Sequence, residues 1–176
     1  VVRCKFQGKT YSRCVYIWVD KDYAVMRGQF QGYPKKIGSI HLTRPTSVGK
    51  AGPRLEQGGT FGATLAAYDH RLIQAKFTIE RESDHAGFVN ALPMVHNRWM
   101  PSIECDGRDS LDEVVTMSGY DAEIGLTFEG SFEIDFFSSP VEEFNLLSPE
   151  ELIKGYYRQV GVSWKGGTTL KRSNLT

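Results

Sequence analysis

The sequence lacks the features of a metal centre, a disulfide framework or a polyanion-binding surface. Only three of its 176 residues are cysteine, and Cys4, Cys14 and Cys105 form no Cys-x-x-Cys pair, so we expect neither a zinc site nor a set of disulfides. Lysine plus arginine and aspartate plus glutamate both number 21, which gives a formal net charge of zero. Without a basic excess or stripe, nucleic acid is not an expected partner.

Long apolar runs and paired histidines are missing as well. No run of about 18 apolar residues occurs and no signal-peptide pattern opens the chain, so we expect a soluble cytoplasmic protein with no membrane partner. The four histidines are scattered, with no i, i+4 pair on a predicted helix, at His41, His70, His85 and His96. We therefore expect no metal ion.

The sequence does contain many short segments of β-type pattern. Apolar residues make up 40% of the chain, enough for one core, and we expect a single domain over residues 1–176. Between Leu72 and Glu80 the residues Ile73, Ala75, Phe77 and Ile79 alternate with a mainly polar set, which is typical of a strand with one buried face. Further strands are expected at Val1 to Phe6, Arg13 to Val19, Ser39 to Thr43, Thr60 to Ala67, Phe88 to Val95, Glu113 to Ser118, Asp121 to Phe128, Ser131 to Phe137 and Tyr156 to Trp164.

Glycine and proline mark the breaks between these segments. Gly8 suits a hairpin turn, Gly130 is expected to mark another turn, and the stretch from Pro45 to Gly59 reads as a loop. The tail from Gly166 to Thr176 is expected to be frayed. Many short strands and two or three short helices favour a mainly β fold built on an antiparallel, barrel-like sheet.

Two segments carry helix signals. Asp20 or Asp22 is placed to cap a short helix that Gly28 would end. The tetrapeptide Ser148-Pro149-Glu150-Glu151 is a capping box with proline at the first helical position, and it predicts a helix as far as Lys154.

The first of these helices leads into the segment Gly32-Tyr33-Pro34-Lys35-Lys36. Proline fixes its own φ and biases the preceding residue to an extended shape, so the lysines follow a stiffened, non-helical turn. A lysine attacks a carbonyl only as the free amine, which requires its pKa to fall from about 10.4 by roughly three units or more. A second cation about 6 Å away contributes about 3 kcal/mol at an effective dielectric constant of about 20, and burial adds a similar amount.

For burial, the sequence offers Phe30, Tyr33 and Ile37 beside the lysine pair. Taken as a dipeptide alone, Lys35-Lys36 is best read as a solvated surface charge, because lysine is rarely buried. The wider run decides between the two interpretations. It resembles the active-site peptide of the acetoacetate decarboxylase family, in which aromatic-Pro-Lys-Lys follows a short helix and the first lysine forms a Schiff base.

By that resemblance Lys35 is the nucleophile and Lys36 is the neighbour that lowers its pKa. Acetoacetate decarboxylase is itself a standing example of a lysine activated by desolvation or by a second cation. The similarity covers most of residues 1–137, including an apolar strand at Cys14 to Asp20 and a helix at Tyr23 to Gly28. It implies a mainly β (α+β) fold, an antiparallel β-cone or open barrel with a few short helices, and a homo-oligomer.

Two departures from the family pattern bear on the chemistry. Where family decarboxylases carry Gly-Arg-Glu, this chain has Arg27-Gly28-Gln29, with a neutral amide in place of the acid. The family's N-terminal segment brings an arginine and a glutamate to the active site, whereas this chain begins at Val1 in what resembles a later strand. We therefore expect this chain to lack that segment, either because the segment was removed or because the protein does not have it.

The resemblance implies a Schiff-base lyase that acts on a small oxo acid without an external cofactor. The simplest reaction is acetoacetate-type decarboxylation through an imine at Lys35. One alternative is a pyruvate aldolase-dehydratase that condenses pyruvate with an aldehyde through the same imine, which the neutral Gln29 and Gln31 favour. Another is a non-catalytic module that binds a small carboxylate.

Other residues are candidates for the site around the imine. Gln31, four residues before Lys35, either orients the substrate or bonds the backbone of the turn. Tyr157 is either a core aromatic or an acid or base in catalysis. The residues expected to contact substrate are Gln29, Phe30, Tyr33 and Tyr156.

Overall fold

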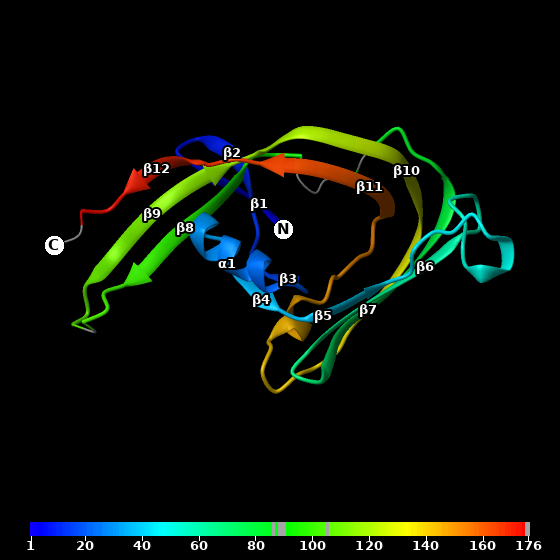
Figure 1. Cartoon of the computed structure of the whole chain (residues 1–176), viewed down its shortest axis with the longest axis horizontal. Helices are drawn as coiled ribbons and strands as arrows, with labels where there is room; N and C mark the ends of the chain where they lie inside the picture. The colour runs from blue at the N-terminus through cyan, green and yellow to red at the C-terminus, as the bar shows by residue number, and fades with distance from the viewer. Residues whose placement is uncertain (86, 88–90, 105, 175–176) are drawn as a thin grey trace. The chain divides into compact units, whose positions relative to one another are not determined.

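The structure, a computed structural model, describes all residues except 86, 88–90, 105 and 175–176. It is mainly β, which confirms the predicted fold class (Figure 1). Its elements in chain order are β1 (Val2–Phe6), β2 (Lys9–Arg13), β3 (Ile17–Val19), α1 (Asp22–Gln31), β4 (Lys35–Ile37), β5 (Ser39–Leu42), η1 (Gly49–Ala51), β6 (Thr60–Ala67), β7 (His70–Glu82), β8 (Met94–Pro101), β9 (Asp109–Met117), β10 (Gly119–Phe136), η2 (Phe144–Leu147), β11 (Gly155–Trp164) and β12 (Thr168–Arg172). No helix in the described part of the chain is long or apolar enough to cross a membrane.

The chain divides into two compact units. Unit 1 comprises residues 1–37, 88–122 and 162–176, and unit 2 comprises residues 38–87 and 123–161. Strands β10 and β11 each begin in one unit and end in the other. The sheets of the two units are described separately below.

Unit 1 holds a five-stranded sheet in the order β1-β2-β8-β9-β12 and a two-stranded parallel ribbon of β3 and β4. The predicted hairpin at its start is confirmed, with Phe6 opposite Lys9, although its second strand ends at Arg13 and does not begin there. A buried cluster of Cys14, Met94, Val115 and Met117 forms the core of this unit.

Two sequence predictions for unit 1 are wrong. The C-terminal tail is not frayed throughout, because β12 pairs with β9 and Arg172 donates from Nε to the buried carboxylate of Glu113 at 2.6 Å. The strand predicted from residue 88 to 95 instead begins at Met94 and runs to Pro101. Residues 88–90 of that prediction lie outside the described residues.

The five strands of unit 2 follow the order β11-β10-β7-β6-β5. Phe61, Phe77, Ile79 and Phe128 form its buried cluster, so the predicted alternation along β7 is confirmed for Phe77 and Ile79. Leu72 departs from that pattern. Its position in the alternation predicts that it faces solvent, but its side chain has no exposed surface. Residues 45–59 form the expected loop, with only the short η1 inside it.

The predicted turn at Gly130 is wrong, because β10 continues through this residue. Its register against β7 shifts between Glu129 and Gly130, as at a β-bulge. A Cβ added at Gly130 would lie 1.9 Å from the carbonyl oxygen of Thr78. The glycine therefore permits a close approach of two backbones, and the two strands predicted around it are one.

The predicted helix at Ser148 is also wrong. Residues 148–154 have no helical structure, and the short η2 lies before them. The hydroxyl of Ser148 donates to the carbonyl of Asn145 at 2.9 Å, so it closes the preceding turn and does not cap a following one. Leu152 and Ile153 are exposed, so the apolar side chains of this segment do not pack on the sheet and do not hold a helix there.

A Gly130→Ala variant tests the bulge. Because the added methyl group would meet backbone rather than a movable side chain, we expect the free energy of unfolding to fall by about 3 kcal/mol in urea denaturation. Gly161→Ala in β11 is the matched control, since a Cβ there meets nothing within 4 Å. Equal stability of the two variants would contradict this account of Gly130.

Candidate active site

Lys35 is the first residue of β4, in a β3-α1-β4 crossover within unit 1. Strands β3 and β4 pair in parallel, with Ile17 opposite Lys35 and Trp18 opposite Lys36. Parallel neighbours need a crossover connection, and α1 supplies it here. The position of Lys35 is therefore determined by the helix that precedes it as well as by the strand pairing.

The helix α1 runs through Gly28 and ends at Gln31, so the predicted end at Gly28 is wrong. Gly32 takes the left-handed conformation, with φ of 76°, and its N–H bonds to the carbonyl of Gly28. Neither predicted aspartate caps the helix, because the N-cap position is Lys21 and no side chain bonds there.

A tight turn centred on Pro34 carries the chain from the helix into β4. The N–H of Tyr33 donates to the carbonyl of Gly28 at 2.9 Å, and the N–H of Lys35 donates to the carbonyl of Tyr33 at 2.8 Å. The second bond spans three residues, as in a γ-turn. The prediction of a positioned, non-helical turn before the lysines is confirmed.

The side chain of Lys35 packs directly on the backbone of Gly28. A Cβ built at Gly28 would lie 2.7 Å from Cδ and 2.8 Å from Cγ of Lys35. Gly28 is buried, so no other residue type fits at this position without moving the lysine. Because Gly28 has no side chain, the stem of Lys35 can lie across the helix at this point.

The amine of Lys35 lies in a partly buried, cationic setting. Its Nζ is 5.4 Å from the centroid of the Tyr33 ring. Burial lowers the pKa of Lys35, and the guanidinium of Arg27 lowers it further, with a smaller opposing effect from Cys14. The fraction of free amine at neutral pH is therefore larger than for an exposed lysine.

Lys36 faces the other way along the strand. Its Nζ lies 5.9 Å from the ring centroid of Tyr16 and 5.8 Å from that of Trp18, two rings that stack on each other. Successive side chains of a strand point to opposite faces. Arg27 is a cation that lowers the pKa of Lys35, and the role of Lys36 as a further neighbour stays a prediction.

Only one of the three apolar residues expected to bury Lys35 does so. Phe30 is 72% exposed and Ile37 is 53% exposed, so the prediction is wrong for both. Tyr33 is partly buried and packs against His96, with ring centroids 4.0 Å apart. The apolar surroundings of the lysine therefore come from Tyr33 and from the stem's own contact with the helix.

A cavity of about 720 Å³ lies next to this arrangement, between the second half of α1 and β8. Three of the predicted substrate contacts line it, namely Gln29, Phe30 and Tyr33. Gln31 and Lys35 are not among its lining residues, although Gly28 and Tyr33, which lie against Lys35, are. Gln31 is the last residue of α1 and directly precedes the C-cap residue, Gly32.

Sequence reasoning missed His96 as part of the cavity wall. Its side chain is 1% exposed, and burial, with the charge of Arg13, lowers its pKa to about 4. Nε2 accepts the N–H of Cys14 at 3.4 Å, so the neutral ring carries its proton on Nδ1. Nδ1 has no hydrogen-bond partner within the described residues. No local sequence signal distinguishes this histidine from the other three.

A buried carboxylate was missed as well. Glu113 is 1% exposed, accepts from Arg98 at 2.6 Å and pairs with Arg172, which joins β8, β9 and β12. Arg98 also lines the cavity. The three residues are far apart in sequence, so only the strand pairing shows that they meet.

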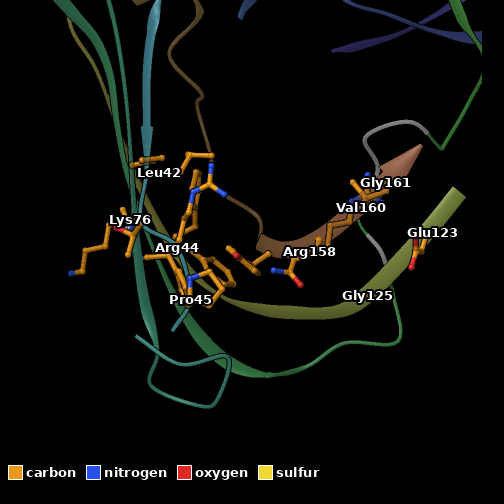
Figure 2. Close-up of a pocket in the computed structure, with 18 residues that line it drawn as sticks. Leu42, Arg44, Pro45, Lys76, Glu123, Gly125, Arg158, Val160 and Gly161 are labelled. Carbon is orange, nitrogen blue, oxygen red and sulfur yellow. Dashed lines mark hydrogen bonds between the residues drawn. The ribbon is translucent and has the colours of Figure 1, made fainter. Parts of the chain in front are cut away.

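Tyr156 and Tyr157 belong to unit 2. The ring of Tyr157 packs 4.7 Å from that of Phe61 and lines a hollow of about 850 Å³ in that unit (Figure 2). Its prediction as a core aromatic is confirmed by this packing, and its catalytic role stays a prediction. Cys4 and Cys14 are free thiols, Cys105 lies outside the described residues, and no group of metal-binding side chains gathers in the described ranges.

Comparison with known proteins gives a consistent set of matches. A family model described as acetoacetate decarboxylase (ADC) matches residues 1–173. The chain is 34% identical to the enduracididine biosynthesis enzyme MppR complexed with pyruvate, with a TM-score of 0.86, covering 97% of this chain and 64% of that one. A search of curated proteins gives no match.

Two further structures match over most of the chain. MppR complexed with the condensation product of pyruvate and imidazole 4-carboxaldehyde is 34% identical, with a TM-score of 0.86 and coverage of 96% of this chain and 63% of that one. An acetoacetate decarboxylase-like enzyme from Sphingomonas wittichii RW1 is 26% identical, with a TM-score of 0.86 and coverage of 97% and 67%. This chain thus spans less than two thirds of the length of the MppR chains that it matches.

Replacing Arg27 by methionine tests which cation acts on Lys35. Because Arg27 lowers the pKa of Lys35, its removal should raise that pKa and move the acidic limb of the rate of imine formation to higher pH. The measurement is the pH dependence of borohydride trapping with pyruvate, followed by mass spectrometry. Lys36→Met is the matched control and should shift the limb less. A larger shift in the Lys36 variant would support Lys36, as predicted from the sequence, as the main cation that lowers the pKa of Lys35.

A Gly28→Ala variant tests the contact between helix and lysine. Alanine favours a helix interior by about 1 kcal/mol over glycine, so the helix itself should persist. The new Cβ must displace the Lys35 side chain, and we expect the trapping rate to fall by about tenfold or more with an unchanged circular dichroism spectrum. Met26→Ala, at an exposed position of the same helix, should keep the full rate. A full rate in Gly28→Ala would contradict the account.

Proposed function

The chain belongs to the acetoacetate decarboxylase family, and from that premise we propose that it is a lyase whose Lys35 forms a Schiff base with the ketone of a small oxo acid. The observation that carries the proposal is the amine itself. Lys35 begins strand β4 directly after a fixed turn, and its side-chain stem packs on the backbone of Gly28. Burial and the charge of Arg27 lower the pKa of its amine. A small oxo acid is the expected partner, and no external cofactor is required.

The first steps are common to all reactions of this class. The free amine of Lys35 adds to the ketone carbon, a proton moves to the former carbonyl oxygen, and water leaves to give a protonated imine. The positive nitrogen then draws electrons from an adjacent bond of the substrate. Loss of a proton from the neighbouring carbon, or of carbon dioxide from a carboxylate on that carbon, gives an enamine, which is the nucleophile of the next step.

We favour the aldolase-dehydratase reaction for the second half. The pyruvate enamine at Lys35 attacks the carbon of an aldehyde, a water molecule leaves from the resulting hydroxyl carbon, and hydrolysis of the imine frees the product. MppR, 34% identical to this chain, is known in complexes with pyruvate and with its condensation product with an aldehyde. The neutral Gln29, where family decarboxylases have an acid, supports the same choice.

Decarboxylation is the second candidate, because the family model that matches is that of acetoacetate decarboxylase. In this reaction the bond from the imine's neighbouring carbon to a β-carboxylate breaks and carbon dioxide leaves. The enamine left on Lys35 takes a proton at carbon, and water then releases the ketone. Both reactions begin with an imine at Lys35, and they differ in the bond that breaks to form the enamine and in what the enamine then attacks.

Several side chains have proposed roles around the imine. Arg27 is a cation that lowers the pKa of the Lys35 amine. We therefore propose that its guanidinium binds the carboxylate of the oxo acid. Gln29 and Tyr33 are assigned to substrate contacts, and Gln31 to the turn backbone or the substrate. Tyr157 belongs to unit 2, and its catalytic role stays a prediction. A homo-oligomer and a cytoplasmic location stay predictions.

Borohydride reduction tests the imine directly. With pyruvate present, mass spectrometry of digested protein should show a reduced adduct on the peptide that contains Lys35. Lys35→Ala should abolish the adduct, because it removes the amine, and Lys36→Ala should keep it. An undiminished adduct in Lys35→Ala, or one on another lysine, would refute the assignment.

The same reagents separate the rival functions. An adduct with acetoacetate and release of carbon dioxide would identify a decarboxylase. An adduct with pyruvate, no carbon dioxide, and a dehydrated product after addition of an aldehyde would identify the aldolase-dehydratase. Binding of either oxo acid without any trapped adduct would show a binding module and contradict both enzymatic proposals.

A further inference from the structure

Unit 2 contains a hollow of its own, which the imine chemistry does not use. It lies over the sheet formed by β5, β6, β7, β10 and β11 and has a volume of about 850 Å³ (Figure 2). That volume is within the range of roughly 300 to 1,000 Å³ typical of small-molecule sites. All of its lining residues belong to unit 2.

One side of this hollow is aromatic. The rings of Phe61 and Phe77 are buried, and Tyr157 packs on both, with centroids 4.7 Å and 6.3 Å away and interplanar angles of 31° and 20°. Phe132 lines the same wall. Phe61 and Phe77 are covered, so Tyr157, which is only partly buried, is the ring on which another planar ring can stack, with about 0.5 to 1.5 kcal/mol per ring pair beyond the area buried.

Small residues keep the hollow open. Ala63 on β6 lies directly opposite Ala75 on β7, and both line it. On the side formed by β11, a Cβ built at Gly161 would meet no atom within 4 Å. Side chains of ordinary size at these positions would occupy the space above the aromatic wall.

Arg44 is one of four charged residues that line the hollow. Arg44 is exposed and has no hydrogen-bond or ion-pair partner among the described residues. Its charge acts on the hydroxyl of Tyr157, where it partly offsets the rise in pKa caused by burial. The guanidinium therefore lies at the aromatic wall with its donors available.

The other charged residues of the lining are Lys76, Arg158 and Glu123. Lys76 is paired with Glu133 at 3.0 Å, and Figure 2 shows its side chain pointing away from the other labelled residues. Arg158 adds a second guanidinium to the lining, and Glu123, the acidic residue of the lining, lies across the hollow from Arg44 (Figure 2). The end near Tyr157 is thus positive.

We propose that this hollow binds a planar aromatic carboxylate, whose carboxylate pairs with Arg44 and whose ring stacks on Tyr157. A guanidinium binds a carboxylate through two parallel hydrogen bonds, a geometry that a lone lysine does not provide. The aromatic wall favours a flat ring over an aliphatic chain. The proposal does not depend on the role assigned to Lys35.

Titration calorimetry with benzoate and trans-cinnamate tests the site. Both should bind, cyclohexanecarboxylate should bind more weakly because it cannot stack, and benzyl alcohol more weakly because it carries no charge. Arg44→Gln should raise the dissociation constant for benzoate by about tenfold, as expected for loss of a charged hydrogen-bonded pair. Lys76→Gln, the matched control, should leave it within about twofold, because its ammonium is already paired.

Variants of the wall test the shape of the site. Tyr157→Phe keeps the ring and should bind nearly as the wild type does, whereas Tyr157→Leu should bind about tenfold more weakly. Ala63→Leu should reduce binding by filling the space. The Lys35→Ala variant should bind benzoate with unchanged affinity. The test of benzoate binding therefore stands even if Lys35 forms no imine. Equal affinity in Arg44→Gln, no preference for a planar ring, or no binding by the wild type would each overturn the proposal.

Discussion

The close contact between Gly28 and Lys35 is the constraint on which the rest of the site depends. Because the helix has no side chain at that point, the lysine stem lies within van der Waals range of the helix backbone. The left-handed cap at Gly32 and the turn at Pro34 then bring β4 into register with β3. Burial in this packing lowers the pKa of Lys35, which raises the fraction of the free amine that the proposed chemistry needs.

The groups around the Lys35 amine add little negative charge that would stabilise its protonated form. Burial raises the pKa of the Cys14 thiol and lowers that of His96 to about 4, so both are uncharged near neutral pH. Arg27 contributes the positive charge that disfavours the ammonium form. A cation next to a neutral amine also suits a substrate that carries a carboxylate beside its ketone.

The sequence predicted the features that are encoded locally. The alternation that ends at Ile79 identified a core strand, and the Pro-Lys-Lys turn identified the candidate nucleophile. Arg27 could not be identified in this way, because its effect on Lys35 requires the helix to continue through Gly28, which reads as a stop signal. Glu113 and His96 were missed for a related reason, since their partners are brought to them only by strand pairing.

The predictions that failed also have physical causes. Gly130 reads as a turn in the sequence, yet it serves the close approach of two paired strands. The capping box at Ser148 is followed by Leu152 and Ile153, but both are exposed, so no packing of apolar side chains holds a helix there. In both cases the local pattern is compatible with more than one structure, and non-local contacts decide between them.

The most direct measurement of the central claim is exchange of the ketone oxygen of pyruvate with oxygen-18 water. Formation and hydrolysis of an imine replace that oxygen whether or not a later step follows. The account predicts that the protein accelerates the exchange far above the uncatalysed rate and that Lys35→Ala does not. Exchange at the uncatalysed rate with the wild-type protein, or equal acceleration by the Lys35 variant, would contradict it.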